Sequence, residues 1–409
     1  MKRSYDVVGY GEGISGLFAC LLLASKGFSC LWVDCSRKTD GISDKRGIAL
    51  PVSMAFFSEV IRQILSSVAP LLPDTLRPAP VRIVQSIIPG VRVNVREKEF
   101  PGGETSLNTL RDTYLKTLSH AMLRPSRLLR FSQRSVLSMN PWEQNLAKGL
   151  SRTGTLNYLS YLRYACACTG MGMLEYETVK EVFTSYLEEM RGEYAEAQDV
   201  ELIHGEHDIA GIRIDETTIK ARYYVTEADP FTSRCDGFLL YGKIHVQEHV
   251  LPVGMGDLLV ISPPEELVHP LLLCVSRGSP QSVLRVSTKV PRDEGLTSLV
   301  ELTSWASGMV MKRIRQIIPF LDGFMDHADF LSISKDQDIR PWFRYAEEEY
   351  PPSFFSRRRY ISPIENLYLC DRMKCASLDG EGELFWGVSI ANAILKDLNR
   401  SDLYGSKAR

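Results

Sequence analysis

The sequence predicts an α/β protein with more than one domain, and three observations support this. The chain opens with a buried strand, a glycine-rich turn and an apolar helix, the order found at the start of a parallel sheet. It has 409 residues, of which 44% are hydrophobic, enough for two domains. Past the middle of the chain the hydrophobic period changes from helical to strand-like, which predicts a second, sheet-containing region.

The opening glycines have the spacing of a dinucleotide-binding turn. After the strand that begins at Tyr5, Gly11, Gly13 and Gly16 follow the pattern G-x-G-x-x-G, and an apolar helix runs on from Leu17. One glycine turns the chain, the second lets a pyrophosphate approach the backbone, and the third lets the helix pack against its strand. This order predicts a Rossmann-like domain.

A carboxylate follows the second predicted strand. Phe28 to Val33 has the composition of a buried strand, and Asp34 comes 23 residues after Gly11. In dinucleotide-binding folds an acid at this spacing accepts hydrogen bonds from the ribose hydroxyl groups. The alternative is a tight turn in an α/β core that binds nothing.

Composition and charge narrow the classes of function. Lys and Arg total 48 against 50 Asp and Glu, so a net charge of −2 gives no reason to expect nucleic acid as a partner. Nine scattered cysteines indicate a reducing compartment and small core residues rather than a disulfide framework. We expect no metal site, no signal peptide and no transmembrane segment, and hence a cytoplasmic protein.

Several elements are predicted between Asp34 and residue 190. Hydrophobic periodicity indicates helices and a hairpin that turns at Pro89-Gly90. The predicted helices are Val52–Ser67, Ser106–Leu123, Leu156–Cys168 and Tyr176–Met190, and the hairpin is Ile83–Glu97.

The second half is predicted to contain mostly strands, with a helix near each end. Strand patterns fall at Val200–His204, Ile209–Ile214, Ile219–Thr226, Leu258–Ile261, Val283–Lys289 and Asn366–Cys370. Asp293 begins a helix that Pro319 ends, and the last helix spans Gly382–Leu398.

Four stretches together resemble a known superfamily. Tyr5–Leu17 is similar to its opening fingerprint and Val179–Pro230 to its helix followed by three strands. Lys312–Pro319 is similar to the helix end of its substrate domain, and Asn366–Leu395 to its last strand, acidic turn and helix. The chain thus resembles the FAD-binding flavoprotein superfamily of phytoene-type desaturases, flavin amine oxidases and Rab GDP-dissociation inhibitors.

The resemblance implies a fold and a division into domains. It implies an α/β protein with a Rossmann-like FAD/NAD(P)-binding domain and a second α+β substrate domain that carries a mixed or antiparallel sheet. The first domain is expected to be discontinuous, with residues 1–80, 175–235 and 355–409. The substrate or cap domain takes residues 81–174 and 236–354.

The resemblance also implies a set of cofactor-binding residues. The glycines face the FAD pyrophosphate, Asp34 holds the adenosine ribose, Val200 lies beside the adenine, and Asp371 lies near the ribityl chain or the pyrophosphate. The first turn of the last helix lies near the isoalloxazine ring. The full set is Gly11, Glu12, Gly13, Ile14, Ser15, Gly16, Asp34, Cys35, Arg46, Val200, Asp371, Gly382, Glu383 and Leu384. No catalytic side chain is assigned.

Two kinds of function remain open. The first is an FAD-dependent oxidoreductase, desaturase-like or amine-oxidase-like, that oxidises a C–C or C–N bond of a largely apolar small molecule. The second is a catalytically inactive binding or assembly protein of the same fold, with a protein partner or a homodimer. Glu12 beside a diphosphate and the lack of a paired glycine after Asp34 favour the second. NAD is the alternative nucleotide, because Asp34 would repel a 2′-phosphate.

Overall fold

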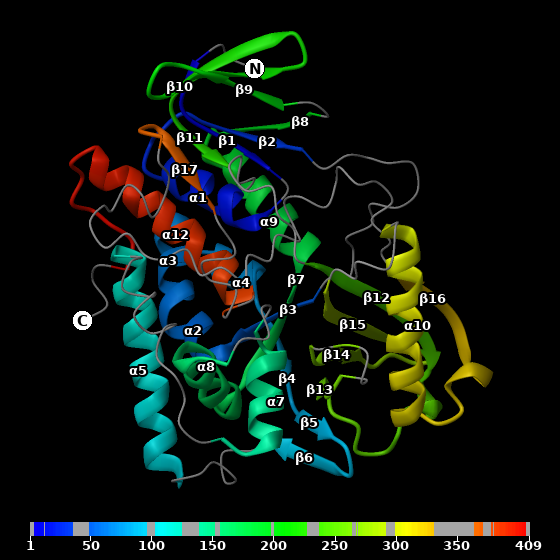
Figure 1. Cartoon of the computed structure of the whole chain (residues 1–409). Helices are drawn as coiled ribbons and strands as arrows, with labels where there is room; N and C mark the ends of the chain where they lie inside the picture. Colours follow the sequence, from blue (N-terminus) through cyan, green and yellow to red (C-terminus); the bar gives the residue numbers. More distant parts are fainter. Residues whose placement is uncertain are drawn as a thin grey trace.

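Two large sheets and the helices around them make up the molecule (Figure 1). The structure is a computed structural model. It describes residues 4–11, 13–35, 49–95, 103–124, 139–151, 156–197, 200–226, 237–263, 267, 269–291, 299–330, 364–370, 378 and 380–405. The predicted α/β class is confirmed, and the division into two domains stays a prediction.

The first sheet has the predicted strands at its centre. Its order is β8-β2-β1-β11-β10-β9, with β17 paired to β11. The strands β8, β2, β1, β11 and β17 run parallel, whereas β9 and β10 pair antiparallel. The bounds are β1 Ser4–Gly11, β2 Cys30–Asp34, β8 Glu193–Glu196, β9 Val200–His204, β10 Ile209–Ile214, β11 Thr217–Thr226 and β17 Leu367–Leu369.

Strand alternation gives this sheet two buried faces. On β2, Cys30 and Trp32 pack on the face with the helices, whereas Leu31 and Val33 pack on the opposite face. Three helices cover the first face, α1 (Ile14–Ala24), α9 (Tyr176–Glu189) and α12 (Gly380–Asp397). Isoleucines of β10 and β11 help to cover the other. Because parallel strands need cover on both sides, this layering stabilises the sheet.

The second sheet is mixed, as predicted. Its order is β16-β12-β15-β14-β13-β5-β6, and only the β13–β5 pair among those described is parallel. Helix α10 (Leu299–Ile317) covers one face (Figure 1), and α7 (Pro141–Gly149) packs near the other. The strands are β5 Val84–Ile88, β6 Val91–Val95, β12 Gly237–Gln247, β13 Leu258–Ile261, β14 Leu271–Ser276, β15 Gln281–Pro291 and β16 Met325–Phe330.

A third, small sheet lies between the two large ones. It has the order β3-β7-β4, with β3 Ala49–Ser53, β7 Met171–Glu175 and β4 Ala79–Val81. Helix α8 (Tyr158–Thr169) lies next to it, and α5 (Gly103–Leu123) packs on α8 (Figure 1). Short helices complete the fold, namely α2 Met54–Phe56, a π-helical turn Phe57–Ile61, α3 Arg62–Val68, α4 Leu72–Thr75, and 3₁₀ turns at Glu248–Val250 and Leu321–Gly323.

The predicted helix start at Val52 is wrong. Val52 lies in β3, where it pairs with Gly172 of β7, and the helix begins at Met54. Ser53 is the residue that ends the strand and caps the helix, since its Oγ accepts a hydrogen bond from the backbone N–H of Phe56 at 3.3 Å. The apolar residues before Ser53 fit a buried strand as well as a helix, so periodicity alone misplaces the boundary.

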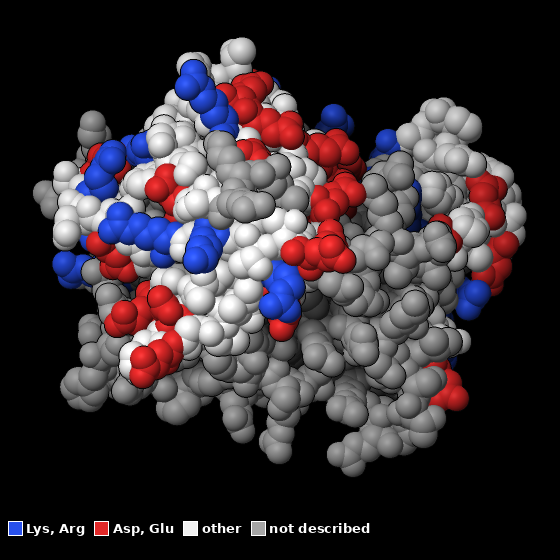
Figure 2. Space-filling model, turned by 90° about the horizontal axis from the view of Figure 1, so that it is seen from above, with Lys and Arg blue, Asp and Glu red and all other residues white. Residues whose placement is uncertain are grey.

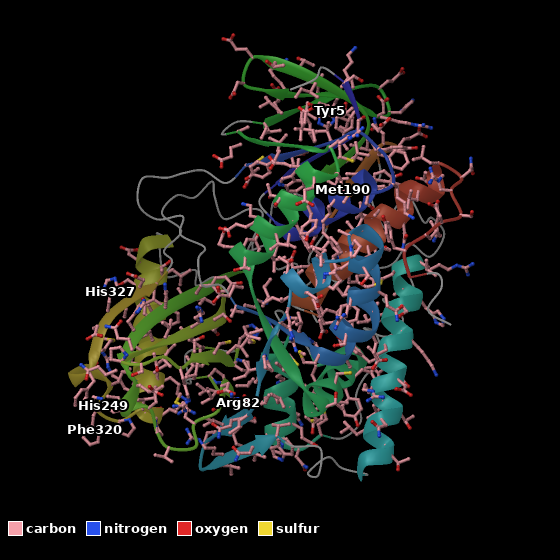
Figure 3. All side chains as sticks on the ribbon, turned by 180° about the vertical axis from the view of Figure 1, so that it is seen from behind. Tyr5, Arg82, Met190, His249, Phe320 and His327 are labelled. Atoms are coloured by element: carbon pink, nitrogen blue, oxygen red, sulfur yellow. The ribbon has the colours of Figure 1, made fainter. Side chains whose placement is uncertain are left out.

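The surface of the described part carries both signs of charge. Viewed from above, Lys and Arg side chains are interspersed with Asp and Glu (Figure 2), and Arg213 and Glu201 form an exposed ion pair at 2.6 Å. His249, Phe320 and His327 lie on the side of the second sheet, far from Tyr5 and Met190 (Figure 3). None of the helices described is long and apolar enough to cross a membrane.

Candidate functional site: the carboxyl edge of the first sheet

The glycine turn lies where β1 ends beside β2. In the parallel register Gly11 pairs with Asp34, and the N–H of Cys35 donates to the carbonyl oxygen of Gly11 at 3.0 Å. The φ angle of Gly11 is +148°, a backbone conformation that residues other than glycine rarely adopt. The first glycine of the motif is thus needed for the backbone shape of the turn.

Helix α1 begins directly after this turn, and its N-terminus lies at the carboxyl edge of the sheet. Gly13 is its N-cap and supplies no side-chain hydrogen bond, and every residue from Ile14 to Ala24, including Ser15 and Gly16, is buried. The first N–H groups of a helix have no partner within the helix and carry a partial positive charge. This end of α1 can therefore hold an anionic group such as a diphosphate.

Ser15 connects α1 to the last helix of the chain. Its Oγ donates a hydrogen bond of 2.6 Å to Oε2 of Glu383, and both side chains are buried. Glu383 belongs to the first turn of α12, so the N-termini of α1 and α12 meet at this contact. The structure thus brings together two predicted site residues that are far apart in the sequence.

Asp34 is buried and already bonded within the protein. Only 2% of it is exposed, the hydroxyl of Tyr194 donates to its Oδ2 at 2.6 Å, and the ammonium of Lys180 forms an ion pair with the same oxygen. Burial, followed by the hydrogen bond to Asp34, raises the pKa of Tyr194 above its ordinary value, so the phenol stays protonated and donates. The charge of Asp34 is therefore offset by a residue that the sequence motif does not contain.

A second buried ion pair lies in the first turn of α12. Glu381 is fully buried, accepts hydrogen bonds from the N–H of Ser53 and the hydroxyl of Tyr114, and lies 3.3 Å from Nε of Arg163. Arg163 also donates from Nη2 to the carbonyl oxygen of Pro51 at 2.9 Å. Burial raises the pKa of Glu381, although Arg163 opposes this shift. The cluster fixes the start of α12 against β3, α5 and α8.

Two nitrogens of Arg163 are buried without a hydrogen bond, Nε and Nη1. Nε lies 3.3 Å from Glu381 in the ion pair, which leaves Nη1 as the donor without an acceptor. A buried unsatisfied donor is costly, and such groups commonly mark the place of a water molecule or a ligand. It lies in the cluster that fixes the first turn of α12, the part of the predicted site assigned to the isoalloxazine ring.

The remaining predicted site residues fall into three groups. Cys35 is half-buried just after Asp34. Gly382 is buried in the first turn of α12, and Leu384 is buried directly after that turn. Val200 begins β9 at the far edge of the sheet, paired with Ile214. Residues outside the described part of the chain are Glu12, Arg46 and Asp371.

The structure adds four residues that the motifs did not indicate, namely Lys180, Tyr194, Arg163 and Tyr114. A lysine within an amphipathic helix and an arginine within a tyrosine-rich one are ordinary surface residues by pattern. What marks this lysine and this arginine as site residues is their burial beside acidic side chains. That burial exists only in the folded chain, so the sequence pattern could not show it. In the part of the chain that is described, His, Cys, Asp and Glu form no group able to hold a metal ion.

The residues present fit a dinucleotide. The turn at Gly11, the N-terminus of α1 and the acid at the end of β2 lie at one carboxyl edge, where ligands bind in folds of this kind. The orphaned Nη1 of Arg163 adds an unsatisfied donor near the start of α12. The site combines positive helix ends with acidic side chains that hold internal partners.

Similar folds occur in solved proteins. An oxidoreductase from Methanosarcina mazei is 10% identical, with 94% of this chain and 99% of that chain covered at a TM-score of 0.57. Cyclohexylamine oxidase from Brevibacterium oxydans IH-35A is 12% identical, with 97% and 100% covered at 0.57. The Rab GDI of Plasmodium falciparum is 10% identical, with 81% and 89% covered at 0.50. No protein-family model matches the chain, and no curated protein sequence matches it.

These findings define the fold. The chain has the fold of the solved oxidoreductase, cyclohexylamine oxidase and Rab GDI, so the predicted resemblance is confirmed for the fold. The structural similarity extends over nearly the whole chain, although the sequence identity is low. Cofactor and activity depend on the site itself.

Proposed function

We propose that the protein is an FAD-dependent oxidoreductase, desaturase-like or amine-oxidase-like, that oxidises a C–C or C–N bond of a largely apolar small molecule. The observation that carries the proposal is the turn at Gly11, with its positive φ angle, leading into the N-terminus of α1 directly beside Asp34 at the carboxyl edge of the sheet. We place the protein in the cytoplasm. NAD is the alternative nucleotide.

Each part of the edge has a role in this proposal. The N-terminus of α1 at Gly13 holds the diphosphate, and Asp34 accepts hydrogen bonds from the adenosine ribose. The first turn of α12 lies next to the isoalloxazine ring, and its helix dipole stabilises negative charge there. FAD, when bound, accepts a hydride equivalent from the substrate. Glu12, Arg46, Val200 and Asp371 complete the proposed site.

The first test is the visible absorption spectrum of freshly purified protein, followed by identification of the nucleotide released on denaturation. A flavin spectrum and released FAD are expected. Gly13→Val should abolish FAD binding in a folded protein, because the side chain would occupy the space of the diphosphate. Gly308→Ala is the control, since a Cβ there meets nothing within 4 Å. Unchanged FAD content in the Gly13→Val protein would overturn the site assignment.

A binding or assembly protein without redox chemistry is the second candidate. One observation favours it, because the buried Ser15 at the start of α1 already donates its hydroxyl hydrogen to Glu383. A colourless protein that takes up neither FAD nor NAD would support this candidate. Its oligomeric state and its capture of a protein partner would then be the measurements to make.

A further inference from the structure

Side chains of three elements meet at a single carboxylate group. Asp34 ends β2, Lys180 lies on α9 and Tyr194 lies on β8, and both of these donors reach Oδ2 of Asp34. Tyr194 stands opposite Trp32 in the parallel register, so it projects from the same face of the sheet as Asp34. The carboxylate is thus held from the helix side and from the neighbouring strand.

Burial makes these contacts strong determinants of the carboxylate position. Asp34 is 2% exposed and Lys180 is 8% exposed. A charged group that is removed from water is tolerated when an opposite charge and hydrogen bonds replace the lost solvation. Loss of Lys180 would leave a buried carboxylate with an uncompensated charge, so Asp34 would change its orientation or take up a proton.

The ion pair also changes the net charge that this edge of the sheet presents to a nucleotide. A lone carboxylate near the N-terminus of α1 would repel a diphosphate, whereas Asp34 paired with Lys180 has little net charge. An ionised carboxylate offers about four lone-pair positions, so a carboxylate that holds an ammonium and a phenol can also accept a hydrogen bond from a hydroxyl group. It therefore suits a neutral hydroxyl donor.

We propose that Lys180 and Tyr194 are positioning residues that orient Asp34 toward the ribose 2′-hydroxyl of an adenosine nucleotide. Lys180 offsets the charge of Asp34, and Tyr194 fixes its direction. The inference rests on the proposed function, because it concerns the nucleotide site of that function. It adds the residues through which the site would favour a ribose with its 2′-hydroxyl group over a 2′-deoxyribose.

The test compares ADP with 2′-deoxy-ADP as probes, with Kd measured by titration calorimetry on flavin-free protein. Wild type is expected to bind ADP about tenfold more tightly, the value of one hydrogen bond to a charged group. Lys180→Met and Tyr194→Phe should reduce this ratio toward one, and Lys180→Arg should restore most of it. In an Asp34→Asn background, Lys180→Met should have no further effect on the ratio.

The control is Lys220→Met, because Lys220 is an exposed lysine on β11 of the same sheet. Thermal unfolding of each variant measures any loss of stability. A purely structural role would lower the melting temperature without changing the ratio of the Kd values for 2′-deoxy-ADP and ADP. A folded Tyr194→Phe or Lys180→Met protein that keeps the wild-type ratio overturns the inference and leaves nucleotide binding intact. A wild-type protein that binds neither ADP nor FAD overturns the proposed function as well.

Discussion

At the scale of single residues, the main feature of this protein is its buried ionisable side chains. Glu381 and Asp34 each lie among donors from other elements, and Arg163 reaches both Glu381 and the backbone of Pro51. Such groups are stable only with their partners, since an unpaired buried charge is expensive. Single substitutions in these clusters should therefore have larger effects than substitutions on the surface.

His269 should make stability depend on pH. Burial, followed by the nearby positive charges of Lys289 and Lys148, lowers the pKa of His269 from 6.5 to about 4. The unfolded chain then binds a proton more readily than the folded one, so this contribution to stability is present above pH 6.5 and is lost as the pH falls toward 4. The upper bound of the loss is about 3.5 kcal/mol, at about 1.4 kcal/mol per pKa unit.

Urea unfolding of wild type and His269→Gln between pH 4 and pH 7.5 would measure this effect. The free energy of unfolding of wild type should fall more steeply on acidification than that of the variant. Carboxyl groups titrate in the same range in both proteins, so the difference between the two curves isolates His269. Parallel curves would contradict the prediction.

At the scale of elements, the crossing of α1 and α12 organises the first layer. A Cβ at Gly387 of α12 would lie 2.6 Å from Cδ1 and 2.9 Å from Cβ of Phe18 on α1. Phe18 is itself fixed, because its ring stacks on Phe183 of α9 with centroids 4.6 Å apart. The absence of a side chain at Gly387 therefore sets how closely the two helices pack.

Gly387→Ala and Gly308→Ala are a matched pair with opposite expected signs. Gly387→Ala should lower the free energy of unfolding by about 1 to 3 kcal/mol through overpacking against Phe18. Gly308→Ala in α10 meets nothing within 4 Å and should raise it by up to about 1 kcal/mol, because alanine is the better helix former. Chemical denaturation measures both, and equal effects would show that the α1–α12 contact is not tight.

At the scale of the whole molecule, α8 joins the two cores. Leu159, Leu162 and Cys166 pack into the core of the first sheet, whereas Tyr164 and Ala165 pack into the core beside α7 and the second sheet. Arg163 lies between these two sets and connects α8 to α12 through Glu381. The buried ion pair therefore lies at the junction of the two halves of the structure.

Arg163→Met should destabilise the protein by about 3 to 5 kcal/mol, because it leaves Glu381 buried without its opposite charge. Adding Glu381→Gln should recover a large part of that loss, since the double variant buries no unpaired charge. Arg213→Met, which breaks the exposed pair with Glu201, should cost less than about 1 kcal/mol. Similar losses for Arg163→Met and Arg213→Met in urea unfolding would contradict a special role for the buried pair.

Local sequence determined much of the fold. The turn at Gly11, β2 ending at Asp34, the three strands from Val200 to Thr226, and the last strand and helix follow from periodicity, glycine spacing and turn residues. These signals work because each depends on neighbours within about one turn or one strand. The small sheet of β3, β7 and β4 could not be predicted, because its pairing joins residues 90 or more positions apart.

The same division holds for the candidate site. The sequence by itself determined the glycine turn, the acid at Asp34 and the place of both at a carboxyl edge, because backbone conformation and strand order are encoded locally. Only the tertiary structure decided that Lys180 and Tyr194 hold Asp34, that Glu383 meets Ser15, and that Arg163 is buried against Glu381. These contacts depend on how distant elements pack, and burial is what turns ordinary charged residues into specific partners.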